Sequence, residues 1–207
     1  MTTPHPYPHT GQSMLELQLT PSVALLGLGN LLRSDDGVGV HAIRSLQQSG
    51  RLPPDVHVIE GGTLGLDLLP AVQGITHLLV LDAVETGSQP GALSRFAGAN
   101  LQRLPVAKSV HLLGFADLLN SLSLLDQLPV EVVLLGVEPE STGWGLILSP
   151  PVAAVLDELA EAALAQLAAW TGYPYERRDA SRRRLRSKPV KAGKPVPLLE
   201  VARLEGG

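Results

Sequence analysis

Short apolar stretches alternate with longer amphipathic stretches along the middle of the chain. Three stretches are almost continuously apolar, at 23–27, 77–82 and 131–137, as is typical of parallel strands covered on both faces. Two weaker strand patterns lie at 56–60 and 92–96. Helical periodicity predicts helices over 37–48, 64–72, 110–121 and 150–170. This order predicts an α/β fold, a three-layer α/β/α sandwich with a largely parallel central sheet.

The two ends of the chain differ in composition from this middle part. Residues 1–21 are rich in Pro, His and Thr, and we expect a disordered N-terminal extension. Residues 172–207 are rich in Arg, Lys and Pro, which predicts a basic, mobile tail. The folded domain is therefore expected to cover residues 22–171.

Composition excludes several classes of function. The chain has no cysteine, which rules out disulfides, thiol catalysis and cysteine-based metal sites on this chain. Aromatic residues make up only 3%, which argues against a base-stacking surface and a nucleic-acid partner. No apolar run approaches the roughly 20 residues needed to span a bilayer, and the N-terminus lacks a signal-peptide pattern. We therefore expect a cytoplasmic protein that does not insert into membranes.

A glycine-rich segment with two adjacent acids follows the first predicted strand. From Val23 to Val40 it reads VALLGLGNLLRSDDGVGV. It lacks the third glycine of a dinucleotide fingerprint, because position 32 is Leu, and no Walker lysine follows. The HExxH and G-x-S-x-G motifs are also absent. These absences make an enzyme that acts on a nucleotide or small molecule at this loop the least favoured hypothesis for the function.

Three polar residues at the ends of apolar elements form a candidate metal site. Asp36 follows the first strand, Asp82 ends the 77–82 strand, and His111 begins the 110–121 helix. If the first and third strands are neighbours, both carboxylates lie at one edge of the sheet, and a returning loop can add the imidazole. Such a set suits Ni, Zn or Fe without choosing between them.

Structural interpretations of these residues stay open at this point. Asp36 can serve as a helix cap, Asp82 can accept hydrogen bonds from loop amides, and His111 can simply begin a helix. Asp35 is interpreted as an N-cap or another structural acid. The other histidines of the domain lie inside predicted elements and are interpreted as structural: His41, His57 and His77.

Beyond these features, the chain resembles the hydrogenase maturation proteases, which trim a C-terminal extension from the large subunit of nickel–iron hydrogenases. The matching segments are GLGNLLRSDDGVGVHAIRSL (27–46), VIEGGTLGLDLL (58–69), HLLVLDAVETGSQPG (77–91), SVHLLGFADLL (109–119) and LLGVEPES (134–141). Together they run in order across residues 23–168. The resemblance implies an endopeptidase that cuts one peptide bond.

The resemblance also implies roles for particular residues. The family's metal-contacting positions fall on Asp36, Asp82 and His111, which would occupy open coordination positions on the substrate's nickel. Position 36 is Glu in some relatives and Asp here, a carboxylate of shorter reach. The segment Glu60, Gly61, Gly62 and Thr63 would lie near the same edge and contribute to substrate binding.

Partner and metal follow from the same resemblance. The implied substrate is the immature, nickel-loaded large-subunit precursor, cut after a His or Arg near its C-terminal cysteine motif. The Ni(2+) belongs to the substrate, while Zn or Cd is expected to occupy the site in vitro. The free protein is expected to be a monomer. Hydrolysis could be metal-assisted or use a carboxylate as general base, as in aspartic-type peptidases. The alternative function is a nickel-binding metallochaperone or sensor without proteolytic activity.

Overall fold

Five strands form one sheet in a computed structural model that describes residues 21–103 and 110–177. They are β1 (Val23–Leu28), β2 (Val56–Gly62), β3 (His77–Ala83), β4 (Leu93–Ala97) and β5 (Glu131–Val137). The strand order is β2-β1-β3-β5-β4, and only the β4–β5 pair is antiparallel. The expected neighbourhood of the first and third strands is therefore confirmed, with Val23 opposite His77.

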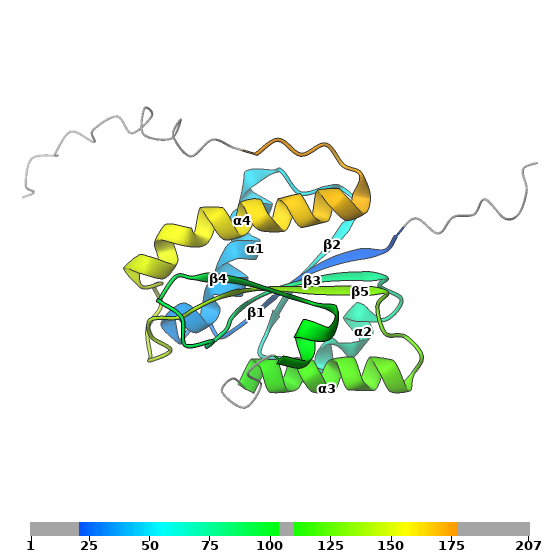
Figure 1. The fold of residues 1–207 in the computed structure, drawn as a ribbon, viewed down its shortest axis with the longest axis horizontal. Helices are drawn as coiled ribbons and strands as arrows, with labels where there is room; N and C mark the ends of the chain where they lie inside the picture. The colour runs from blue at the N-terminus through cyan, green and yellow to red at the C-terminus, as the bar shows by residue number, and fades with distance from the viewer. Residues whose placement is uncertain (1–20, 104–109, 178–207) are drawn as a thin grey trace, which may run out of the picture. The chain divides into compact units, whose positions relative to one another are not determined.

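Helices cover both faces of this sheet (Figure 1). α1 (Val38–Ser49) and α4 (Pro150–Thr171) pack on one face, and α2 (Leu69–Val72) and α3 (Val110–Leu124) pack on the other. Successive strand residues feed the two cores, as the alternation of side chains along a strand requires: Leu25 and Leu79 face α1 and α4, whereas Leu26 and Val80 face the opposite core. The predicted three-layer α/β/α sandwich is confirmed.

Local structure differs from the predicted elements in several places. A 3₁₀ helix, η1 (Ser34–Gly37), precedes α1, which begins one residue later than predicted. β2 continues through Gly62, so two residues of the expected loop belong to the strand. The predicted 64–72 helix is divided into η2 (Gly65–Leu68) and α2. Pro70, at the start of α2, has no N–H and therefore cannot donate the hydrogen bond that would continue a single helix. A further 3₁₀ helix, η3 (Gly98–Arg103), follows β4.

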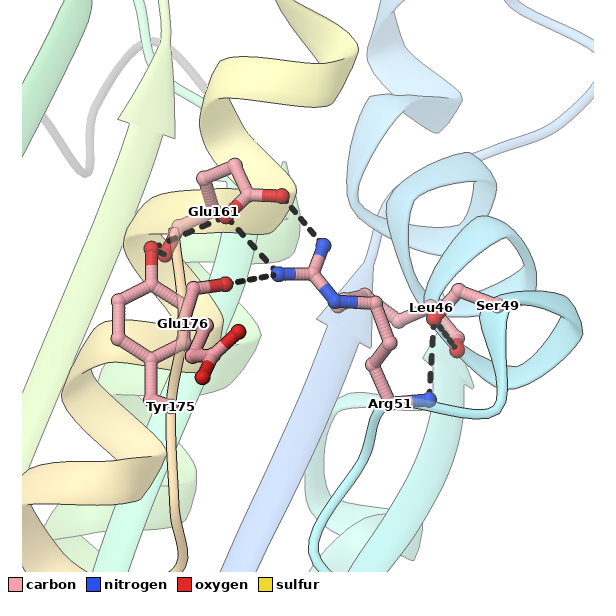
Figure 2. A network of polar contacts seen from close by, with 6 residues as sticks. All are labelled: Leu46, Ser49, Arg51, Glu161, Tyr175 and Glu176. Atoms are coloured by element: carbon pink, nitrogen blue, oxygen red, sulfur yellow. Dashed lines mark hydrogen bonds and ion pairs between the residues drawn. The ribbon is translucent and has the colours of Figure 1, made fainter. Parts of the chain in front are cut away.

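The chain after α4 is anchored to the domain (Figure 2). Arg51, just after α1, forms a two-pronged ion pair with Glu161 of α4 and also donates to the Glu176 carbonyl (3.1 Å). The Tyr175 hydroxyl donates to Glu161 Oε2 (3.0 Å), and burial is the largest cause that raises its pKa. The first residues of the predicted tail, 172–177, thus contact the folded domain.

Two expected segments lie outside the described residues: most of the 1–21 extension and the tail from residue 178 onward. Within the described part of the chain, no helix combines the length and the apolarity that crossing a bilayer requires.

Candidate functional site

The glycine-rich segment makes a tight turn at the carboxyl end of β1. Gly29 adopts a φ of +112°, and a Cβ there would lie 1.7 Å from the Asp36 carbonyl oxygen. Its N–H donates to the Gly62 carbonyl at the end of β2 (2.9 Å). Only glycine allows this backbone conformation and this approach. This turn places η1 against the carboxyl end of β1.

A second close approach fixes the start of α1 over the sheet. A Cβ at Gly39 would lie 2.0 Å from the Leu81 carbonyl oxygen and 2.5 Å from that of Leu28. The first turn of α1 therefore rests directly on the carboxyl ends of β3 and β1. Because Asp82 follows Leu81 and Asp36 lies three residues before Gly39, the structure brings both carboxylates to the same edge of the sheet.

The two carboxylates have different surroundings. Asp36 is half-buried, and its Oδ2 accepts a hydrogen bond from the Asn30 N–H (3.0 Å). Asp82 is fully buried, and its Oδ1 accepts from the Ala83 N–H (2.8 Å). This donor is the last residue of β3, so the open interpretation of Asp82 as an acceptor for loop amides is not what this hydrogen bond shows. Asp36 bonds a loop amide rather than a helix N-terminus, so it is not a helix cap.

Position 111 is the second residue of α3. The His111 side chain lies outside what the structure describes, so its convergence with the carboxylates stays a prediction. The backbone can be placed through the following turn, since a Cβ at Gly114 would lie 3.1 Å from the Cα of Gly65 in η2. η2 follows β2, so α3 begins at the carboxyl edge of the sheet, the edge that α1 also overlies (Figure 1).

The predicted substrate-binding segment borders an open depression of about 230 Å³ at this edge. It is lined by Glu60, Gly62 and Thr63, by residues 29–31 and by Val40. Glu60 also forms an exposed ion pair with Arg44 of α1 (2.9 Å). Gly61 faces the core instead, since a Cβ there would lie 2.5 Å from Leu26 Cδ1. Three of the four residues can therefore meet a ligand in the depression.

Asp35 has a larger structural role than the sequence suggested. It is fully buried, and neither η1 nor α1 has a side-chain cap, so the N-cap interpretation is wrong and the interpretation as another structural acid is confirmed. Its Oδ2 accepts from the Glu140 N–H (2.9 Å), the Ser141 N–H (3.0 Å) and the Ser149 hydroxyl (2.8 Å). Its Oδ1 accepts from the Ser149 N–H (2.7 Å). Asp35 thereby ties the glycine-rich loop to the segment between β5 and α4.

Comparison with known proteins gives consistent matches. The family profile described as hydrogenase maturation protease matches residues 40–166. The hydrogenase expression/formation protein HoxM of Azotobacter vinelandii is 36% identical over 177 residues, covering 84% of this chain and 85% of its own. The hydrogenase 2 maturation protease of Escherichia coli is 35% identical over 147 residues, covering 70% of this chain and 90% of its own. The solved hydrogenase maturating endopeptidase HybD from E. coli superposes with a TM-score of 0.67 at 32% identity, covering 71% of this chain and 92% of that one.

Proposed function

The chain belongs to the hydrogenase maturation protease family, and we propose that it removes the C-terminal extension from the nickel-loaded precursor of a [NiFe] hydrogenase large subunit. One observation carries the finer part of this proposal. Asp36 and Asp82, from segments far apart in sequence, lie at the carboxyl edge of adjacent parallel strands, where α/β proteins place their chemistry.

The residues at this edge suit a metal that arrives with the substrate. Two carboxylates and an imidazole are ordinary ligands for a divalent transition metal and would leave positions open for the substrate's own ligands. Asp36, Asp82 and His111 would contact the Ni(2+) of the precursor, and Zn or Cd would take its place in vitro. The nickel, once bound, would supply Lewis-acid polarisation of a carbonyl or water.

This chain's own residues would position the scissile segment. The depression lined by Glu60, Gly62, Thr63 and residues 29–31 offers polar groups along which an extended peptide can lie. The Asn30 N–H holds the Asp36 carboxylate beside this depression. A carboxylate in this position can also act as general base toward water. We propose that the protein works in the cytoplasm and is a monomer before it binds the precursor.

The test is incubation of the full chain with nickel-loaded and nickel-free large-subunit precursor, followed by mass spectrometry. We expect loss of the C-terminal peptide only from the loaded precursor. Asp36→Asn, Asp82→Asn and His111→Ala should each lower the cleavage rate at least 100-fold. Two exposed residues, Asp55 and His57, supply the matched controls Asp55→Asn and His57→Ala, which should cleave at the wild-type rate.

Two results would contradict the proposal. A loaded precursor that binds but keeps its full mass would instead support the metallochaperone or sensor alternative. Wild-type cleavage by the Asp82→Asn protein would remove Asp82 from the site. Circular dichroism and the melting temperature of each variant show whether a lost activity comes from a lost fold.

A further inference from the structure

Large apolar side chains are exposed beside the candidate site. Trp144, Leu146 and Ile147, in the segment between β5 and α4, are 85%, 69% and 82% exposed, and Leu32 of the glycine-rich loop is 53% exposed. We call these four residues the apolar rim. Clustered apolar exposure of this kind usually marks an interaction surface.

Backbone hydrogen bonds hold the two parts of the apolar rim together. The Gly145 N–H donates to the Leu32 carbonyl (3.0 Å), and the Ser34 N–H donates to the Gly145 carbonyl (2.9 Å). The Arg33 Nε donates to the Thr142 carbonyl (2.8 Å). The buried Asp35 carboxylate ties the same two segments from below. The rim is therefore held in place and does not depend on a flexible loop.

An acidic hollow lies next to the apolar rim. It has a volume of about 290 Å³ and is lined by Glu85, Glu138 and the 139–142 segment, which includes Glu140. Burial alone would raise the pKa of Glu138, but hydrogen bonds from the Thr86 hydroxyl and backbone lower it below its usual value. Arg33, at the border, adds one positive charge, so the surface has an excess of negative charge suited to a basic group.

The position of the apolar rim relates it to the candidate site. Leu32 follows Leu31, which lines the depression, and lies four residues before Asp36. Glu85 of the acidic hollow lies three residues after Asp82. A polypeptide that crosses the carboxyl edge at Asp36 and Asp82 would therefore meet the rim and the hollow together.

We propose that the apolar rim and the acidic hollow bind an extended segment of the large-subunit precursor in which large apolar side chains adjoin a basic one. This inference rests on the proposed function, because that function brings the precursor to the adjoining edge. A symmetric second copy fits less well, since a two-fold contact would place one acidic hollow near the other.

Trp144 provides a direct probe of binding. The chain has two tryptophans, and Trp170 is partly buried and donates to Glu131 (2.8 Å). In the otherwise full-length Trp170→Phe protein, all tryptophan emission therefore comes from Trp144. We expect the emission of a water-exposed indole in the free protein and a shift to shorter wavelength when the precursor is added.

A matched pair of variants separates docking from chemistry. Ile147 and Val130 are both 82% exposed, and Val130 lies immediately before β5, at the opposite edge of the sheet. Ile147→Ser should raise the KM for precursor cleavage at least tenfold and leave kcat within twofold, because it removes binding surface and no reacting group. Val130→Ser should leave both constants unchanged. Glu140→Gln should also raise KM, and the precursor should bind less tightly at high salt.

Each outcome bears on one of the two proposals. Unchanged kinetics for Ile147→Ser, with normal cleavage, would overturn the docking surface and leave the proposed function intact. A Trp144 shift with a precursor that is never cut would support the docking surface and overturn the proposed function. A short-wavelength emission already present in the free protein, and lost on dilution or on removal of residues 178–207, would assign the apolar rim to a second copy or to the chain's own tail and overturn the inference.

Discussion

Replacing Asp35 by Asn tests the buried contact that joins the two halves of the candidate site. The substitution keeps the size of the side chain but removes its charge and one acceptor. In the best orientation, the amide oxygen takes the place of Oδ2 and keeps three donors, from Glu140, Ser141 and the Ser149 hydroxyl. The amide NH₂ then faces the Ser149 N–H, whose 2.7 Å hydrogen bond is lost.

The expected destabilisation follows from these contacts. A buried donor left without an acceptor costs about 1–3 kcal/mol, and each of three charge-assisted hydrogen bonds weakens by roughly 1 kcal/mol on becoming neutral. The carboxylate's own burial penalty disappears and offsets part of this loss. We therefore expect a net loss of about 2–4 kcal/mol in the free energy of unfolding, which corresponds to a melting temperature lower by roughly 5–15 °C for a domain of this size.

Urea denaturation followed by circular dichroism measures the loss, with the exposed Asp55→Asn protein as control. Amide hydrogen exchange locates it, because the Glu140, Ser141 and Ser149 N–H groups should exchange faster while the β1 and β3 amides keep their relative protection. An Asp35→Asn protein within about 0.5 kcal/mol of the wild type, with those three amides still protected, would refute the reasoning.

Three further predictions concern other parts of the domain. Gly39→Ala should destabilise the fold by about 3 kcal/mol in urea, because its Cβ meets strand carbonyls, whereas Gly143→Ala, with only a 3.4 Å contact to a hydroxyl, should change little. A chain ending at Arg177 should unfold at the wild-type urea concentration. A chain ending at Thr171 should lose about 1–3 kcal/mol of its free energy of unfolding, because the Tyr175 and Glu176 contacts are removed. Equal stability of the two shortened chains would contradict this prediction. Burial lowers the pKa of His41 below its ordinary 6.5, so its contribution to stability should be complete above pH 6.5 and be lost as the pH falls below that value. An NMR titration midpoint at or above 6.5 would be inconsistent with this prediction.

The sheet could be predicted because the burial of its central strands is reflected in their apolar sequences. β1 is buried at every residue and β3 at all but its first, and burial on both faces favours the nearly continuous apolar stretches seen there, with Asp82 as the polar exception near the end of β3. The shared carboxyl-edge position of Asp36 and Asp82 was predicted on the condition that the first and third strands are neighbours, which the structure confirms. The antiparallel direction of β4 had no such signal, because none of its residues is fully buried and both directions suit the same five-residue pattern.

The role of Asp35 could not be predicted from its local sequence. Its partners lie 105 to 114 residues further along the chain. Three of the four donors are backbone N–H groups that any sequence with the same turn would provide, and the fourth is the Ser149 hydroxyl. The apolar rim was missed for a related reason. Trp144, Leu146 and Ile147 follow no helical or strand period, and only the structure shows that they remain exposed.

The structure explains why the two adjacent acids differ. Asp35 and Asp36 lie in η1, and successive side chains of a 3₁₀ helix point about 120° apart. One carboxylate therefore turns inward to the segment between β5 and α4, while its neighbour accepts from the Asn30 N–H at the depression. The same four-residue helix carries both, so a change that releases Asp35 also shifts the backbone that positions Asp36. Asp35→Asn should consequently slow precursor cleavage even at temperatures where the protein remains folded, although Asp35 is buried away from the substrate.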